Sequence, residues 1–386
     1  MPILGIESSC DETAAAVVRG GRDILSSVVA SQDDVHRKYG GVVPELASRE
    51  HLRRIVPVVR EALERAGLDF AGLAAIGVTR GPGLIGSLLV GYTYGQTLAA
   101  ALGKPLVPVN HLEGHVHAVF LEAQQGKEGA TGSALPELPA VCLIVSGGHT
   151  VLYDVRAANG DVAASAAAPV GYPAFRCAYG RIGATRDDAA GEAYDKVAKL
   201  LALGYPGGPV MDQLAAHGNP AAVAFTPPHT RGNAFDFSFS GIKTAVLRHI
   251  RQNPAFEAEI RARQEALSDG RGRRAAELLP LCSRATLDLV ASFQRAVVSD
   301  LVHRTIAAAE ERAARCVLVS GGVAANSELR ATFAREASRR ALPVFFPSRL
   351  LSTDNAAMIA AAAYPRLLAG EIASEGIGAE ANLPLA

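Results

Sequence analysis

The chain has 386 residues, 49% of them hydrophobic, which is enough for two or three domains with sizeable cores. Its 38 basic and 38 acidic residues leave no net charge. No overall field would therefore attract a nucleic acid, and contact with RNA would require local basic patches. Five scattered cysteines form no CxxC pair, which argues against a zinc ribbon or a disulfide scaffold and fits a reducing compartment.

The N-terminal residues, from Met1 to Glu7, lack both the basic region and the long apolar region of a signal peptide. The apolar run Ala356–Ala363 is too short to cross a bilayer. We therefore expect a soluble, cytoplasmic protein without a membrane partner.

Short β-type runs alternate with helical ones, which predicts a layered α/β fold. In chain order, the expected strands are Ile3–Glu7, Ala15–Val18, Ala74–Thr79, Val107–Asn110, Ala140–Ser146, Val151–Val155, Cys316–Ser320 and Pro343–Phe346. The expected helices are Leu84–Leu102, Asp187–Leu203 and Ser327–Leu342.

Two further segments stand out by composition. Gln124–Pro139 is rich in Gly, Ala and Pro and is typical of a linker between two halves. Asn253–Pro280 is charged and indicates an exposed helical excursion, which is either a solvated face or a contact surface for an RNA backbone. Its arginines are Arg261, Arg263, Arg271, Arg273 and Arg274.

Three strand-to-turn segments resemble one another. An apolar strand runs into Ser8-Ser9, into Ser146-Gly147-Gly148 and into Ser320-Gly321-Gly322. Such turns allow backbone N–H groups to approach a phosphate, although a tight hairpin explains a single copy equally well. The repetition predicts a duplicated domain with a nucleotide between its halves.

His111 and His115 are spaced four residues apart, so on a helix they lie on one face and can bind one metal ion. Metallopeptidases use the same spacing but place a glutamate directly after the first histidine, where this chain has Leu112. Glu113 lies about 200° around the helix from His111 and would point away from the metal. His117 is also off this face. The alternative is a helix whose histidines only cap or pack.

Several acidic residues are candidates for the remaining chemistry. Asp11 and Glu12 follow the first turn, where they could coordinate a divalent ion or accept a proton, unless Asp11 only stabilises the turn. Asp195 could accept the two hydroxyls of a ribose, or belong to an ordinary helix with acidic residues in its first turn. Asp354 either caps the next helix or supplies the third ligand of the two-histidine site.

Taken together, these segments resemble the universal tRNA N6-adenosine threonylcarbamoyltransferase family over nearly the whole chain. The matching runs are Gly5–Thr13, Gly81–Leu84, Asn110–His115, Val145–Thr150, Asp187–Lys196, Ser238–Thr244, Ser320–Asn326 and Thr353–Asn355. The segments Arg156–Gly183 and Asn253–Pro280 look longer than expected for the family.

The resemblance implies a duplicated actin-like ATPase fold with the site in the cleft between two lobes. We expect an N-terminal lobe over residues 1–130 and a C-terminal lobe over 131–386, with the last helix packing back on the first lobe. The implied metal ligands are His111, His115 and Asp354, for Fe²⁺ or zinc. The implied substrate-binding residues are Ile144, Val145, Ser146, Gly147, Gly148, Asp195, Gly208 and Asn326.

The resemblance also implies the reaction, which is transfer of threonylcarbamoyl from its adenylate to the N6 of the tRNA adenosine 3′ of the anticodon. We assign proton removal to Asp11, with Glu12 as support. The implied partners are tRNA, threonylcarbamoyl-AMP, a paralogous actin-like subunit and a small ATPase. A metallopeptidase and a non-catalytic ATP-binding scaffold remain as alternatives.

Overall fold

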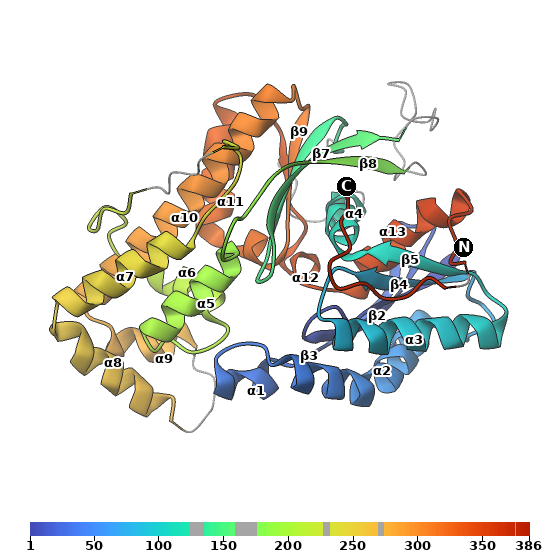
Figure 1. The fold of residues 1–386 in the computed structure, drawn as a ribbon, viewed down its shortest axis with the longest axis horizontal. Helices are drawn as coiled ribbons and strands as arrows, with labels where there is room; N and C mark the ends of the chain where they lie inside the picture. Colours follow the sequence, from blue (N-terminus) through green and yellow to red (C-terminus); the bar gives the residue numbers. More distant parts are fainter. Residues whose placement is uncertain (124–134, 159–175, 227–231, 269–273, 375) are drawn as a thin grey trace.

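The computed structural model describes residues 1–123, 135–158, 176–226, 232–268, 274–374 and 376–386. Two five-stranded sheets form its framework (Figure 1). The first contains β1 (Pro2–Glu7), β2 (Glu12–Arg19), β3 (Asp23–Ser31), β4 (Ala75–Gly81) and β5 (Leu106–Asn110). The second contains β6 (Ala140–Val145), β7 (Thr150–Ala157), β8 (Cys177–Ala184), β9 (Cys316–Ser320) and β10 (Val344–Phe345).

The two sheets have the same topology. The first has the order β3-β2-β1-β4-β5, and the second has the order β8-β7-β6-β9-β10. In each, the first three strands form an antiparallel meander, and the next strand pairs in parallel with the first. This repetition confirms the predicted duplication of an α/β unit.

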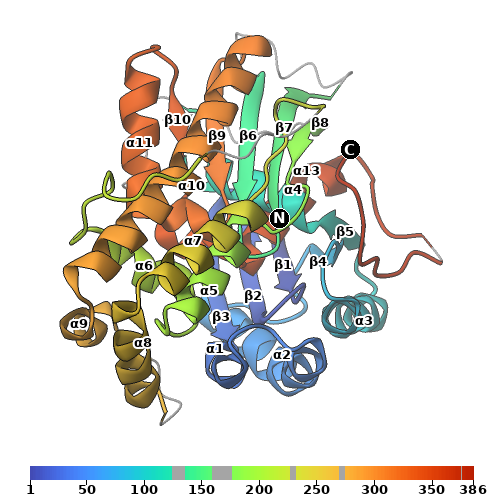
Figure 2. The ribbon, with the colours of Figure 1, turned by 60° about the vertical axis from the view of Figure 1, so that its left-hand side comes forward.

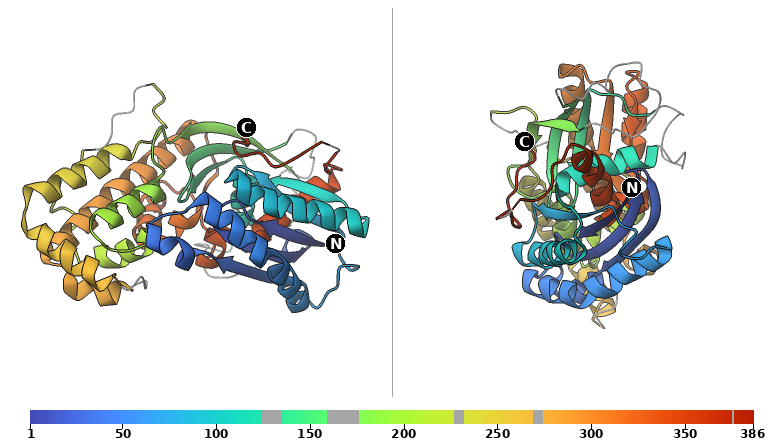
Figure 3. Two further views of the ribbon diagram at one scale, coloured as in Figure 1. Left: turned by 60° about the horizontal axis from the view of Figure 1, so that its bottom comes forward. Right: turned by 90° about the vertical axis from the view of Figure 1, so that its right-hand side faces the viewer.

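Helices cover both sheets and also fill the space between them. The helices are α1 (Asp33–His36), α2 (Pro44–Ala66), α3 (Ile85–Leu102), α4 (His111–Ala123), α5 (Ala190–Leu200), α6 (Gly207–Ala215), α7 (Ser240–Gln252), α8 (Ala255–Ala266), α9 (Ala275–Leu278), α10 (Arg284–Glu311), α11 (Ser327–Ser338), α12 (Arg349–Ser352) and α13 (Ala356–Leu368). Short 3₁₀ turns occur at Arg37–Tyr39, Leu279–Leu281 and Gly322–Ala325. Helices α4 and α13 lie between the two sheets, as Figures 2 and 3 also show.

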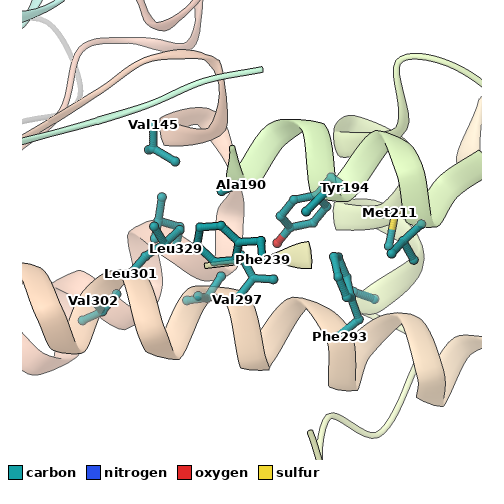
Figure 4. Close-up of a cluster of buried hydrophobic side chains, with 14 of the residues drawn as sticks. Val145, Ala190, Tyr194, Met211, Phe239, Phe293, Val297, Leu301, Val302 and Leu329 are labelled. Carbon is teal, nitrogen blue, oxygen red and sulfur yellow. The ribbon is translucent and has the colours of Figure 1, made fainter. Parts of the chain in front are cut away.

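Helices α4 and α13 can pack between the two sheets because each sheet is apolar on both faces. In β6, Val141 and Leu143 belong to the outer core of the second half, whereas Cys142 and Ile144 face the central helices. This period-two alternation, with both sides buried, is expected of strands covered on both faces. The outer core packs Tyr194 of α5 edge-to-face against Phe293 of α10 (Figure 4).

Small residues bring α13 close to β1. A Cβ atom at Gly5 would lie 2.9 Å from the backbone nitrogen of Ala360 and would also collide with the carbonyl of Ala356. The alanine-rich sequence of α13 is therefore a packing surface, and every residue from Ala356 to Ala363 is buried. After α13 the chain returns along the first sheet, where Ala373 donates a backbone hydrogen bond to Leu106 of β5. The lobe boundary at residues 130 and 131 stays a prediction.

Several expected elements differ from the structure. The helix expected from Asp187 begins at Ala190, and the helix expected to reach Leu342 ends at Ser338. Strands β3 and β8 and the long helices α2 and α10 were not predicted. The expected linker falls largely on residues 124–134, which lie outside the described residues, as do 159–175 of the segment Arg156–Gly183. Within the described chain, no helix has the length and apolar character needed to cross a membrane.

The charged excursion is helical, as predicted, but it is not simply exposed. Arg263 of α8 is completely buried and donates to the carbonyl oxygens of Leu201 and Leu281. It therefore fastens α8 to the second half and has no surface for RNA. Arg261 and Arg274 are exposed and ion-paired with glutamates, whereas Arg271 and Arg273 fall outside the described residues.

Candidate metal and substrate site

His111, His115 and Asp354 lie together where the two halves meet. Helix α4 begins at His111, directly after β5, and its first turns place both imidazoles on one face. The Oδ1 atom of Asp354 lies 3.6 Å from His111 Nε2 and 3.2 Å from His115 Nε2. Asn355, rather than Asp354, caps α13 by accepting a hydrogen bond from the backbone N–H of Met358, so the capping alternative for Asp354 is wrong.

Glu7 determines which nitrogen of His111 faces this group. The carboxylate is completely buried at the end of β1 and accepts hydrogen bonds from the Thr79 hydroxyl and the Ser9 backbone N–H. His111 Nδ1 lies 3.0 Å from Glu7 Oε2. Because a carboxylate can only accept, Nδ1 carries the hydrogen, and Nε2 is turned toward Asp354.

The buried charges strongly influence one another. Burial alone would lower the pKa of His111, but Asp354 and Glu7 raise it to about 9. Burial opposes ionisation of Asp354 and Glu7, yet the neighbouring His111 holds the pKa of each carboxyl below its usual value. Without a metal ion, the site therefore stores a proton between two carboxylates.

The donor set suits a divalent metal ion. The three candidate ligand atoms all lie within 4.8 Å of one another. Donors at about 2.0–2.1 Å from a tetrahedral ion would lie roughly 3.4 Å apart, close to the two distances to Asp354. Neither ring nitrogen of His115, which is buried, meets hydrogen-bond geometry with a partner in the described part of the chain. A buried imidazole with an unused nitrogen beside a carboxylate fits a metal ligand.

Asp11 lies in the turn between β1 and β2, and Glu12 is the first residue of β2. Burial, and then the charge of Asp11, raise the pKa of Glu12 well above its usual value. Both effects favour the uncharged form of the Glu12 carboxyl. Asp354 also contributes to this shift, so the acidic pair lies close enough to the three candidate ligands to feel their charge.

The turn after β6 provides open backbone beside the candidate ligands. Gly147 and Gly148 are exposed, and a Cβ atom at either position would meet nothing within 4 Å. The Ser146 hydroxyl accepts the backbone N–H of His149, which shapes the turn. Of the predicted substrate-binding residues, Ile144 and Val145 are completely buried in β6, which leaves their side chains no route to a ligand.

Asp195 and Gly208 meet at the start of α6. Asp195 Oδ1 accepts the Gly207 N–H at 2.7 Å and so satisfies a free donor of this helix. Burial raises the pKa of Asp195 to about 6, against the effect of this hydrogen bond. Asp11, in the turn before β2 of the first half, adds to the shift, so the two carboxylates approach each other between the halves. Gly208 has free space around its Cα.

Asn326 is more enclosed than the sequence suggested. Its side-chain oxygen caps α11 by accepting the Leu329 N–H, and its amide nitrogen donates to Gln294. Both polar ends of the side chain are therefore used within the protein, which suits a support for the turn Ser320–Gly322 better than a direct ligand contact.

Sequence reasoning placed Asp187 at the start of a helix, which is wrong. Its carboxylate accepts the hydroxyls of Ser238 and Ser240 and the backbone N–H of Phe239.

Two residues near the site were not predicted from the sequence. Glu7 looked like an ordinary strand end, although its carboxylate binds His111. His149 was not singled out, although the centre of its ring lies 6.1 Å from that of His111. Burial lowers the pKa of His149 to about 4, so this imidazole is neutral.

Comparisons with known proteins identify the family of this chain. The family model described as tRNA N6-adenosine threonylcarbamoyltransferase matches residues 23–361. A curated protein of this name from Koribacter versatilis is 56% identical to this chain, over 99% of this chain and 98% of the relative. Another, from Clostridium perfringens, is 45% identical over the same shares of the two chains. The solved structure of HypF from T. kodakarensis matches 97% of this chain and 49% of its own, with a TM-score of 0.53 and 15% identity.

The likeness to HypF concerns the fold alone and agrees with the duplicated actin-like architecture. The family match and the two relatives cover the segments that supply the histidines, the glycine turn and Asp354. On these grounds the chain belongs to the tRNA N6-adenosine threonylcarbamoyltransferase family and is a transferase.

Proposed function

We propose that the protein transfers the L-threonylcarbamoyl group from threonylcarbamoyl-AMP to N6 of the adenosine 3′ of the anticodon. The tRNAs would be those reading codons that begin with A, and AMP would be released. The observation that carries this proposal is the group formed by the buried His111 and His115 with the partly exposed Asp354, which lies beside an open glycine turn and an acidic pair. Because tRNA is the acceptor, we also propose a cytoplasmic location.

The adenylate would lie between the halves. The open backbone at Gly147 and Gly148 would approach its phosphate, since neither glycine has a side chain and the space at both Cβ positions is empty within 4 Å. Asp195 would accept a ribose hydroxyl through the carboxylate oxygen that does not accept the Gly207 N–H. Holding the donor and the adenosine in one orientation supplies a large part of such a rate enhancement.

His111, His115 and Asp354 would hold one Fe²⁺ or zinc ion, which would supply Lewis-acid chemistry toward the phosphate or the carbamoyl oxygen. Glu7 keeps the Nε2 lone pair of His111 directed into this site through its hydrogen bond to Nδ1.

Asp11 would take the proton from the adenosine amine as the bond from N6 to the carbamoyl carbon forms. The bond from that carbon to the phosphate oxygen breaks, and the electron pair leaves with AMP. Burial and the charge of Asp11 favour the uncharged form of Glu12, which would limit repulsion of the anionic donor. A base next to a desolvated amine fits general base catalysis. The anticodon loop presents unstacked bases, so no duplex must open.

Two other functions are less well supported. A metallopeptidase with this histidine spacing has its base directly after the first histidine, where this chain has Leu112, and Glu113 is bound to Arg366 at 2.9 Å. A non-catalytic ATP-binding scaffold would not require the buried pair of histidines with a third ligand. We further propose that a paralogous actin-like subunit and a small ATPase act with this chain.

The test is a reconstituted reaction with tRNA, threonylcarbamoyl-AMP and the partner proteins, read by mass spectrometry of the nucleosides. We expect the modified adenosine from the wild type and none from the His111→Ala/His115→Ala double variant, if circular dichroism shows that it is folded. Full activity of that variant without metal would remove the metal from the mechanism.

The role of Asp11 is tested separately. Asp11→Asn should slow transfer more than it weakens binding of the adenylate, because the amide preserves shape but accepts no proton. An equal loss of both would assign Asp11 to binding. Cleavage of a glycoprotein that is abolished by a chelator would instead favour the metallopeptidase.

A further inference from the structure

We propose that Glu113 and Arg366 form a buried brace that positions the three candidate metal ligands. Glu113 is then a positioning residue, although it touches neither the metal site nor a substrate. This inference rests on the proposed metal site. It adds a reason why two helices from distant parts of the chain keep their ligands at the distances that a metal ion requires.

Helix α4 uses two opposite faces. His111 and His115 point toward Asp354, whereas Glu113 lies about 200° around the helix from His111. The side chain of Glu113 is 4% exposed, so its carboxylate is almost entirely removed from water. Arg366 Nε donates to Glu113 Oε2 at 2.9 Å, across 253 residues of sequence. A buried carboxylate of this kind requires a charged partner.

Helix α13 provides the other half of the brace. Asp354 directly precedes its capping residue Asn355, and Arg366 lies in its last turn. Thus the element that brings the third ligand also carries the arginine that binds the histidine-bearing helix. Any shift of α13 relative to α4 would move Asp354 away from His115 and strain the ion pair at the same time.

The two helices touch closely between these points. A Cβ atom at Gly114 would lie 2.8 Å from Ile359 Cδ1 and 3.1 Å from Met358 Cγ. This contact leaves little space for sliding or rotation, because packed interiors resist small changes in volume. Gly114 therefore sets the spacing of the helices, and the pair of Glu113 and Arg366 sets their rotation.

A further ion pair extends the brace to the second sheet. Arg366 Nη1 donates to Glu371 Oε2 at 2.9 Å, and Arg176 Nη1 donates to the other oxygen of Glu371. Arg176 directly precedes β8. The network thus joins α4, α13 and the second sheet on the side of α4 that is away from the candidate ligands.

If the brace is disrupted, the metal affinity should fall and the geometry of the bound ion should change. Changes to groups that orient metal ligands lower metal affinity by about 10–100-fold. Because this brace acts through two helices rather than by a direct hydrogen bond to a ligand, we expect about a tenfold loss for Arg366→Met, at the lower end of that range. Glu113→Gln should change affinity in the same direction, and Arg366→Lys should restore part of it.

The experiment titrates the metal-free full-length chain with Co²⁺, and measures the affinity by competition with a chelator and the geometry from the visible absorption spectrum. The matched control is Asp300→Asn, which breaks a similarly buried ion pair with Arg304 on α10, remote from the site. We expect the control to lower the melting temperature while the affinity and the spectrum stay those of the wild type.

The possible results distinguish the positioning role of Glu113 and Arg366 from the metal site itself. Brace variants that lose thermal stability but bind Co²⁺ with wild-type affinity and spectrum would overturn the positioning role alone. If Arg366→Met does not fold, Glu113→Gln and Arg366→Lys decide the question. A His111→Ala variant that binds Co²⁺ as well as the wild type would refute the metal site itself, and the brace with it.

Discussion

The proton stored beside the candidate metal ligands makes metal affinity strongly dependent on pH. In the metal-free protein, Asp354 and Glu7 raise the pKa of His111 to about 9 against the effect of burial. A metal ion needs the Nε2 lone pair, so this proton must leave before His111 can bind it. Between pH 8 and pH 6 we therefore expect about a 100-fold loss of apparent affinity from this single proton, which is about tenfold per unit.

The same proton has the opposite effect on the stability of the metal-free fold. The ordinary pKa of histidine is 6.5, and its value here is raised, so the stabilisation is complete below about pH 6.5 and is lost as the pH rises through 9. The difference of about 2.5 units corresponds to about 3 kcal/mol, counted once because the three groups share one proton. Because the pKa values of Asp354 and Glu7 are lowered, the stability that these carboxylates contribute is present above the ordinary carboxyl pKa of about 4 and is lost as the pH falls below it.

The measurement is calorimetric titration with Zn²⁺ or Co²⁺ at pH 6, 7 and 8, in two buffers that differ in ionisation enthalpy. Near pH 7 we expect release of about one proton per ion bound. Glu7→Gln, which removes one of the two carboxylates that raise the pKa of His111, should move the pH dependence to lower pH. Metal affinity that is constant from pH 6 to pH 8, without proton release, would refute the reasoning.

Further predictions concern the packing and the substrate. Gly5→Ala should lower the free energy of unfolding by about 1–3 kcal/mol in urea titrations, because its Cβ would collide with α13, whereas Gly148→Ala should stay within about 0.5 kcal/mol of the wild type. If the turn approaches a phosphate, Gly148→Ala should nevertheless weaken binding of AMP, and unchanged binding would contradict that role. Because the pKa of Asp195 is about 6, AMP affinity should fall as the pH decreases through 6, and Asp195→Asn should bind weakly at every pH. A variant with the wild-type pH profile would exclude Asp195 as a ribose ligand.

Local sequence patterns were enough to predict much of the fold. Strands β6 and β9 were found nearly to the residue, because each is a short apolar run that ends at a Ser-Gly-Gly turn. Strand β8 was missed, since only part of it is buried and its sequence shows little apolar alternation. Asp187 was misassigned because the donors that engage it, around Ser238, lie far away in sequence.

By itself, the sequence determined that His111 and His115 share one face of a helix and that Glu113 does not, because helical spacing is a local property. Only the tertiary structure decided what surrounds them. It placed Asp354 beside the histidines and paired Glu7 with Nδ1 of His111. It also formed the ion pair between Glu113 and Arg366, which lie 253 residues apart. Such contacts depend on how two sheets and two central helices pack, and no spacing within a single segment encodes that arrangement.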